Sequence, residues 1–282
     1  MLGKTIQIYL TDGNPRGIRV ADITSRTIQA LLIPRSHLKE GLSRPEIEGV
    51  GIYLLFGETE SSTKPLVYIG EAEDCKKRIS QHNLSTSKIN WNTALVITSK
   101  TLYFTKSHVK YLENYCYTSA LNSGRFQLQN ISTPTKSYIP DPVVADLMDI
   151  FETMKILVST LGFPVFDIMS KKKTKHTLIC EGKGAKAFGN YTEDGLTVLK
   201  KSSANLLVTP SASPWISNYR KSLLDGEIIF IKDGFYEFKE DYIFESVSRA
   251  SSVILGRNSN GWSQWKYENG RTLDEVIRQD IS

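Results

Sequence analysis

The 282-residue sequence contains only three cysteines, which lie far apart in the chain. Cys75, Cys116 and Cys180 form no C-x-x-C pair, so a structural zinc site and a disulfide framework are not expected, and the odd number fits reduced thiols. Long apolar runs are also missing: no stretch approaches the length of a membrane span, and the first residues, MLGKTIQIYL, lack the apolar core of a secretory signal. We therefore expect a cytoplasmic protein without a membrane partner.

Neither sign of charge dominates the chain. Its 35 basic and 30 acidic residues leave a net charge of +5. Residues 171–282 hold 17 basic and 14 acidic side chains, and the first 170 residues hold the remaining 18 and 16. Because neither half is a polycation, contact with a nucleic acid has to come from local clusters such as Lys76-Lys77-Arg78.

The pattern of residues 1–140 predicts an α+β fold, with a small, mostly antiparallel sheet flanked by helices. Alternating apolar residues around an Asp12-Gly13-Asn14-Pro15 turn predict a hairpin, so we assign residues 1–46 to a β-rich N-terminal extension. In residues 47–140, apolar runs at 51–56 and 66–69 predict a second hairpin. A helix at 74–83, a strand at 94–100 and a helix capped by Ser107 and ended by Gly124 follow.

The remaining residues predict a long helix and a second, smaller domain. Asp141-Pro142 is a cap and first-turn signal for a helix that ends at Gly162, and the lysine-rich SKKKTK segment follows it. We assign residues 141–170 to this long helix and a linker. Residues 171–282 alternate strand-like runs with turn signals, with a short helix at 246–256, and predict a small α+β domain.

Two tripeptides on the second hairpin, Gly51-Ile52-Tyr53 and Tyr68-Ile69-Gly70, precede a helix that carries Arg78 and, one turn later, His82. Because these two residues are four apart, their side chains share a helix face and can converge on one phosphate, which the planar arginine fork binds with two parallel hydrogen bonds. Each of these residues also has an ordinary explanation: the tyrosines as strand aromatics, the basic residues as a solvated helix face.

In this order the residues resemble the GIY-YIG endonuclease family over roughly residues 49–135, in the stand-alone bacterial type with an accessory domain. The resemblance implies a phosphodiester hydrolase that uses Mg²⁺ or Mn²⁺ bound by Glu113. It implies catalytic roles for Tyr53, Tyr68, Arg78, His82, Glu113 and Asn130, with Asn122 as a competing asparagine. Lys76 and Lys77 beside the arginine are expected to contact nucleic acid.

The role of Tyr53 stays open at this point. A free tyrosine titrates near pH ~10, so a general base requires a nearby cation, Arg78 or the metal, to lower its pKa. Otherwise Tyr53 would only orient the water, and a metal-bound hydroxide would attack. Two departures from the family matter: the long loop at 54–67, and Glu71 where the excision-repair branch carries a lysine. Together they make a repair-incision role doubtful.

The C-terminal run FESVSRASSVILGRNSNGWSQWK is similar to a small domain of uncharacterised function that is often fused to bacterial nucleases or encoded beside adenine methylase genes. The family more usually has proline at the position of Val247. Arg257, Asn258 and Trp262 are the expected nucleic-acid contacts there. The competing explanation is that Trp262 and Trp265 anchor the core of this domain.

The main hypothesis is a metal-dependent endonuclease that cuts DNA, with RNA also compatible, in restriction or phage defence. One alternative is a non-catalytic nucleic-acid-binding module that retains the fold. Another is a subunit that works only in a complex, with the C-terminal domain as its interaction platform. A homodimer or an accessory protein partner is compatible with cleavage of both strands.

Overall fold

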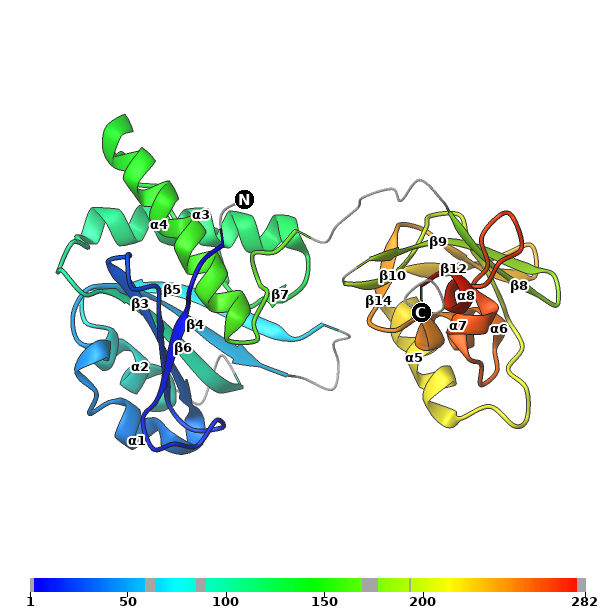
Figure 1. The fold of residues 1–282 in the computed structure, drawn as a ribbon, viewed down its shortest axis with the longest axis horizontal. Helices are drawn as coiled ribbons and strands as arrows, with labels where there is room; N and C mark the ends of the chain where they lie inside the picture. The colour runs from blue at the N-terminus through cyan, green and yellow to red at the C-terminus, as the bar shows by residue number, and fades with distance from the viewer. Residues whose placement is uncertain (1–2, 59–63, 85–89, 169–176, 193, 278–282) are drawn as a thin grey trace. The chain divides into compact units, whose positions relative to one another are not determined.

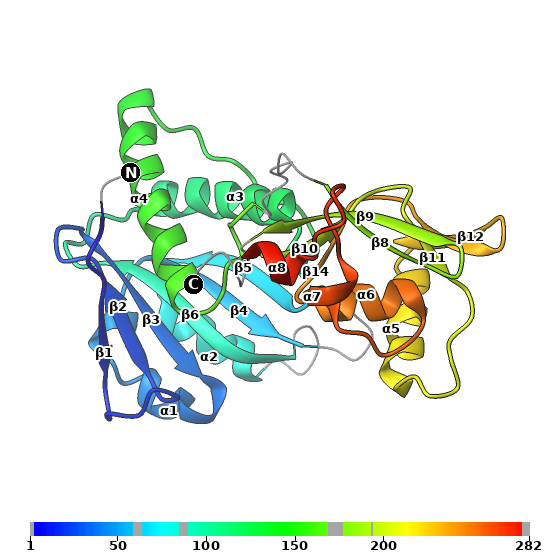
Figure 2. The same cartoon turned by 45° about the vertical axis from the view of Figure 1, so that its right-hand side comes forward.

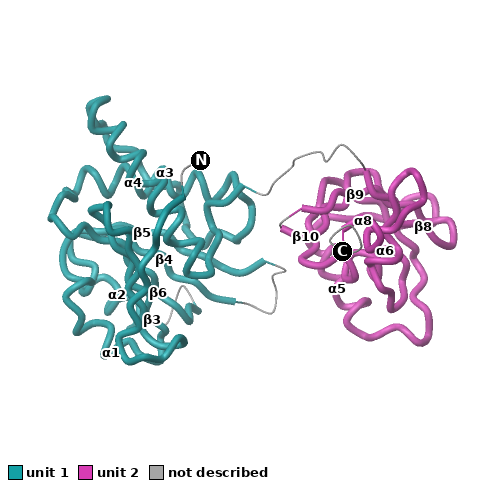
Figure 3. Tube along the Cα trace, viewed as in Figure 1, with its two compact units in different colours: residues 1–168 teal, residues 169–282 magenta. Residues whose placement is uncertain are grey.

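The computed structural model describes residues 3–58, 64–84, 90–168, 177–192 and 194–277. The chain divides into two compact units, residues 1–168 and residues 169–282 (Figure 3). This division falls within two residues of the boundary expected near residue 170, while the lysine-rich segment itself lies outside the described residues. Both units combine antiparallel sheets with flanking helices, which confirms the predicted α+β class.

The first unit contains a seven-stranded sheet in the order β1-β2-β3-β6-β4-β5-β7. Its strands are β1 (Gln7–Leu10), β2 (Arg19–Asp22), β3 (Ile28–Pro34), β4 (Gly51–Gly57), β5 (Leu66–Ala72), β6 (Trp91–Ser99) and β7 (Gln127–Leu128). All neighbours are antiparallel except β5 and β7, which are parallel. Because β3 pairs with β6 along its whole length, the N-terminal extension is part of this sheet.

Helices cover both faces of this sheet (Figures 1 and 2). The longer helices α3 (Lys106–Ser123) and α4 (Asp141–Thr160) pack on one face, where their apolar side chains join those of β4 and β6 in one core cluster. The helices α1 (Leu38–Gly41) and α2 (Cys75–Leu84) lie against the other face and contribute to a second cluster. A sheet buried on both faces explains why β4 is apolar along its whole length. Two short 3₁₀ turns, η1 (Arg35–His37) and η2 (Pro45–Ile47), flank α1.

The ends of two predicted helices need correction. The cap of α3 is Thr105, not Ser107: its side chain accepts a hydrogen bond from the backbone amide of His108, and Nδ1 of the His108 ring accepts one from the backbone amide of Thr105. This reciprocal pair gives a partner to two backbone amides at the start of the helix. With a cap at Ser107 the first turn would begin later, and the helix would be shorter. Asp141 is not the cap of α4 but its first helical residue, where its charge favours the positive end of the helix.

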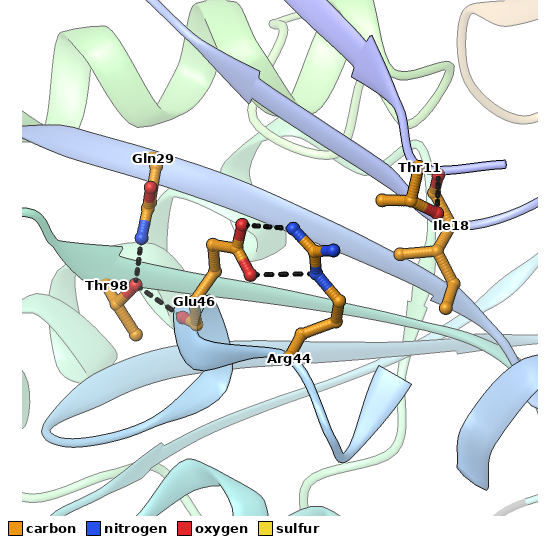
Figure 4. A network of polar contacts seen from close by, with 6 residues as sticks. All are labelled: Thr11, Ile18, Gln29, Arg44, Glu46 and Thr98. Carbon is orange, nitrogen blue, oxygen red and sulfur yellow. Dashed lines mark hydrogen bonds and ion pairs between the residues drawn. The ribbon is translucent and has the colours of Figure 1, made fainter. Parts of the chain in front are cut away.

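Polar contacts fix the loop that leads into β4 (Figure 4). Arg44 and Glu46 form a two-pronged ion pair, with distances of 2.6 Å from Nη2 to Oε1 and 3.0 Å from Nε to Oε2. The buried hydroxyl of Thr98 donates to the carbonyl of Glu46 at 2.8 Å and accepts from Gln29 at 3.4 Å. These contacts attach the segment before β4 to β6 and, through Gln29, to β3, and so hold the start of β4 in register.

The second unit contains a four-stranded sheet in the order β14-β10-β9-β8 and a three-stranded sheet in the order β11-β13-β12. The strands are β8 (Leu178–Gly182), β9 (Ala185–Thr192), β10 (Gly195–Val198), β11 (Ser203–Asn205), β12 (Ile229–Lys232), β13 (Phe235–Phe238) and β14 (Tyr242–Phe244). The helices are α5 (Pro214–Asp225), α6 (Val247–Leu255), α7 (Gly261–Gln264) and α8 (Leu273–Ile277).

The core of the second unit forms around α6, which is buried on nearly every side. Trp265 is fully buried there and donates a hydrogen bond from its indole nitrogen to the carbonyl of Val247 at 3.2 Å. Trp265 is therefore a core anchor of this unit. In the described parts of both units, no helix is long and apolar enough to cross a bilayer.

Candidate active site

The two tyrosines of the tripeptides lie on the face of the sheet that α2 covers. In the antiparallel pairing of β4 with β5, Tyr53 lies opposite Gly70, and Leu55 lies opposite Tyr68. Tyr53 and Tyr68 are therefore diagonal neighbours on one face, where long side chains reach each other. Their ring centroids are 6.0 Å apart.

The helix α2 places Arg78 and His82 over these rings. Nε of Arg78 donates to the hydroxyl of Tyr53 at 3.2 Å, and the same hydroxyl lies 2.9 Å from Nε2 of His82. The imidazole lies 5.4 Å from the ring of Tyr53 and 5.2 Å from that of Tyr68. Arg78 remains exposed to solvent while Tyr53 is fully buried. The structure thus brings four of the predicted residues into one cluster.

The glycines of the tripeptides leave room for this cluster. A Cβ atom at Gly70 would lie 2.3 Å from both Cζ and Oη of Tyr53, so the phenol ring occupies the space of the missing side chain. A Cβ atom at Gly51 would lie 2.5 Å from the carbonyl oxygen of Ile97 and 2.9 Å from Sγ of Cys75. Close approach therefore favours glycine at both positions: the ring of Tyr53 approaches Gly70, and the backbone of Ile97 and the thiol of Cys75 approach Gly51.

Burial sets the protonation states in the cluster. Burial, helped by the neighbouring Tyr68, raises the pKa of Tyr53 well above its usual value, and this outweighs the opposite effect of Arg78. Burial also lowers the pKa of His82 to about 4, with a further contribution from the positive charge of Arg78. The hydrogen bond to Tyr53 raises the pKa of Arg78. Near neutral pH the phenol of Tyr53 is therefore protonated and the imidazole of His82 neutral. A free phenolate base would require a lowered pKa at Tyr53, and the pKa is raised instead.

The other two predicted residues lie along the outer edge of β5. The amide side chain of Asn130 accepts from the backbone nitrogen of Ile69 at 3.1 Å and donates to its carbonyl at 2.7 Å. Two residues further along this edge, the carboxylate of Glu113 accepts a hydrogen bond from the backbone amide of Glu71. Asn130 and Glu113 thus continue the pairing that β7 makes with the start of β5. They contact the strand that carries Tyr68 and not the cluster of Tyr53.

Glu113 is close to a second carboxylate and to a lysine. Burial and the negative charge of Glu71 raise the pKa of Glu113 to about 7, against the smaller opposing effects of the Glu71 amide, Lys106 and Lys110. Nζ of Lys106 lies 2.8 Å from the carboxylate of Glu71 and 3.7 Å from that of Glu73. Glu113 and Glu71 are two neighbouring carboxylates whose repulsion Lys106 and Lys110 offset only in part, so an added cation there would relieve repulsion.

These residues fit a magnesium site of the water-rich kind. Mg²⁺ is usually held by one or two carboxylates and keeps several of its waters, and the pair Glu113 and Glu71 supplies that number. No group of three or more histidine, cysteine, aspartate or glutamate side chains is arranged to bind a metal within the described ranges. A cage built entirely from protein ligands is therefore absent from that part of the chain.

Sequence reasoning missed Glu71 and Lys106 as members of this site. Glu71 directly follows the second tripeptide, but it was noted only as a departure from the family. Lys106 precedes Glu113 by seven residues on α3, which is two helical turns, so both side chains face the same side. That spacing was readable from the sequence and would have indicated the lysine.

The remaining predicted nucleic-acid contacts are spread over both units. Lys76 and Lys77 are exposed on α2, and Lys76 lies 3.8 Å from Glu48. In the second unit Arg257 donates to the side chain of Gln264 at 3.1 Å.

The amide of Asn258, another predicted contact, bridges the backbone of Ser213 and Ser211 at 3.2 and 3.3 Å. Trp262 is half-buried, with its ring 5.6 Å from that of Tyr191, against the core of the second unit. Asn258 therefore links two loops, and Trp262 shares the packing role of the neighbouring Trp265.

Comparison with known proteins bears on the second unit alone. Residues 178–277 match the model of a domain family described as a domain of unknown function, DUF4357. No curated protein and no solved structure matches the chain. The comparisons therefore leave the function of the first unit to be argued from its geometry.

Proposed function

We propose that this protein is an endonuclease that hydrolyses phosphodiester bonds in DNA with the help of a divalent metal ion, Mg²⁺ or Mn²⁺. The observation that carries the proposal is the hydrogen-bonded chain from Arg78 through Tyr53 to His82, beside Tyr68. Phosphodiester hydrolysis needs a cation at the non-bridging oxygens and a group that accepts a proton from water. In these hydrogen-bonded residues Arg78 is the cation, and His82, through Tyr53, is the proton acceptor.

Arg78 would bind the phosphate. Its Nε is directed to Tyr53 and its Nη1 to the side chain of Gln81 at 3.3 Å, so the guanidinium is held from two sides while still reaching solvent. The remaining N–H groups are available to the oxygens of a phosphate, where the charge of the transition state develops.

Tyr53 and His82 would move the proton. The hydroxyl oxygen of Tyr53 accepts a hydrogen bond from Arg78, so its own proton is directed to another acceptor. In the tautomer with Nδ1 protonated, the unprotonated Nε2 of His82, at 2.9 Å, can accept this proton, in competition with the hydroxyl of Tyr68. Because burial keeps the imidazole neutral near pH 7, it can receive a proton that the attacking water passes to Tyr53. Tyr53 then acts as a relay, and no free phenolate is needed.

Glu113 and Glu71 would hold the metal ion at the edge of β5. When bound, the ion supplies positive charge at the phosphate and lowers the pKa of water. Lys106 holds the carboxylate of Glu71 in place and offsets part of the repulsion between the two glutamates. Restriction or phage defence is the proposed setting, because a DNA-cutting unit joined to a second unit suits selective cleavage of foreign DNA.

One observation favours a second candidate, a nucleic-acid-binding subunit without catalysis. The carboxylate of Glu113 already accepts the backbone amide of Glu71, and Lys106 already pairs with Glu71. In that case these groups serve only to close the edge of β5, and the cluster around Arg78 binds phosphate without hydrolysing the ester.

Nicking of supercoiled plasmid by Arg78→Lys and Lys39→Gln variants separates the two functions. Lysine keeps the charge of Arg78 but loses the fork, so we expect nicking to fall by about 10²-fold or more, as for loss of one donor to a developing charge. Lys39→Gln removes an exposed charge from α1, which contributes no residue to the cluster around Arg78, and should change nicking by less than about threefold. Plasmid binding without nicking by the parent protein would support the binding subunit instead.

A further inference from the structure

The second unit has an open cavity of about 390 Å³ at the N-terminal end of α6. Three segments line it: the start of α5, the first turns of α6 and the loop before α7. The lining residues are Trp215, Ser246, Ser248, Arg249, Ser252, Asn258 and Ser259. Each of them is polar or aromatic, and none is acidic. We propose that this cavity binds one nucleotide of a single-stranded nucleic acid, with its phosphate at Arg249 and its base on Trp215.

Two serine hydroxyls that line the cavity can donate to a ligand. Oγ of Ser246 accepts a hydrogen bond from the backbone amide of Arg249 at 3.1 Å, and Oγ of Ser248 accepts one from the amide of Gly261 at 2.9 Å. A hydroxyl group that accepts from a backbone amide keeps its own proton for another acceptor, and both serines line the cavity. Such a lining selects an anion, which the positive end of α6 also favours.

Arg249 supplies the charge for this anion. Nη1 of its guanidinium lies 2.6 Å from the carboxylate of Glu245, and the guanidinium lies 5.7 Å from the ring centroid of Tyr219. Glu245 is 83% exposed, so this ion pair is well solvated and contributes little. A phosphate can therefore share or replace the carboxylate, while the ring below keeps the guanidinium in place.

Trp215 supplies a stacking surface at the same cavity. The residue is 39% exposed, and its ring meets that of Tyr219 edge to face, with centroids 6.3 Å apart and an interplanar angle of 83°. An exposed indole beside an anion site is the arrangement with which proteins bind unpaired bases, since every base can stack on it. Trp262, expected from the sequence to have this role, instead lies half-buried in the core.

The size of the cavity and the exposed indole together indicate the ligand. A volume of about 390 Å³ is within the range of roughly 300–1,000 Å³ for small-molecule sites, so one nucleotide fits in the cavity. Stacking on Trp215 needs a base with a free face, either in a single strand or extruded from a duplex. A phosphorylated protein segment supplies the anion but no stacking ring, so the exposed indole favours the nucleotide.

Binding of fluorescein-labelled oligodeoxythymidine by the full-length chain, in EDTA, tests this site apart from any cleavage. We expect Trp215→Ala and Arg249→Gln each to weaken binding about tenfold. Lys221→Gln, a charge change on the exposed side of α5, is the matched control and should change binding less than twofold. Performing the titrations in an Arg78→Gln background lowers the contribution of the first unit, and this contribution is then the same for all the variants compared.

An abasic oligonucleotide of the same length separates the two contacts. Trp215→Ala should lose its effect on this probe, because no base is left to stack, while Arg249→Gln should weaken it as before. Equal binding of thymidine oligonucleotide by all variants would overturn the proposal, and so would tighter binding of a phosphoserine peptide. A Glu113→Gln variant that binds the oligonucleotide normally but does not nick plasmid would leave this site standing. Failure of the binding proposal and failure of the nuclease proposal are therefore distinguishable, because binding in EDTA and nicking are measured separately.

Discussion

Replacing Gly70 with alanine tests how the glycine of the second tripeptide makes room for the cluster around Tyr53. The added Cβ atom would lie 2.3 Å from Cζ and Oη of Tyr53, against 3.4 Å for ordinary contact, so the ring must move by about 1.1 Å. Because Tyr53 is fully buried and its hydroxyl contacts Arg78 and His82, this movement both overpacks the core and breaks the hydrogen-bonded chain. We expect a loss of about 2–3 kcal/mol in the free energy of unfolding.

A double-mutant cycle with Tyr53→Leu shows whether this contact is the cause. Leucine lacks all three ring atoms that the Cβ atom at Gly70 would meet, so Gly70→Ala should then cost less than about 0.5 kcal/mol. Urea unfolding followed by circular dichroism measures the four proteins. An equal loss from Gly70→Ala in both backgrounds would refute the argument, because the strand would then be intolerant of alanine for a reason unrelated to Tyr53.

Other predictions concern titration and a buried charge. Since burial lowers the pKa of His82 to about 4, the unfolded chain binds more protons between about pH 6.5 and pH 4. Stability should therefore fall as the pH drops through this window, and urea unfolding should show a smaller fall for His82→Gln. The pKa of Glu113, raised to about 7, predicts the opposite pH dependence: its contribution lowers stability as the pH rises from about 4.5 to 7. Binding of Mg²⁺ should then release protons from Glu113, which calorimetry in two buffers detects. Arg220 is buried and donates to the carbonyl of Val253, so Arg220→Met should cost about 2–4 kcal/mol in urea unfolding by leaving that carbonyl without its donor.

The sequence predicted that four residues of the candidate site would lie close together. Tyr53, Tyr68, Arg78 and His82 come from one hairpin and the helix directly after it. Their relative placement depends on strand alternation and helix spacing, both of which are periodic features of a single short segment. The structure accordingly brings these four side chains together.

Pairings between distant segments could not be predicted in the same way. The pattern of residues 1–46 predicts strands but does not show that β3 pairs with β6, about 60 to 70 residues later in the chain. The segment 141–170 read as a helix and linker, but Leu147, Met154 and Leu157 of α4 are buried in the core of the first unit. Periodicity shows that such a strand or helix has an apolar face and does not show which partner covers it.

Exposure of aromatic side chains was the least predictable feature of the second unit. Trp262 and Trp215 both lie in polar surroundings in the sequence, and only tertiary packing decides that Trp262 contacts the core and that Trp215 faces the cavity beside Arg249. The contact of Lys106 with Glu71 has the same origin, since α3 and β5 meet only in the folded unit.

The central claim is tested most directly by incubating supercoiled plasmid with the purified chain and Mg²⁺ or Mn²⁺, beside Glu113→Gln and Tyr53→Phe variants. We predict nicking by the parent protein, none by Glu113→Gln, and a rate at least about 10²-fold lower for Tyr53→Phe, because phenylalanine interrupts the path from water to His82. Failure of the folded parent protein to cut plasmid, single strands or RNA would contradict the claim, and so would undiminished nicking by the Glu113→Gln variant.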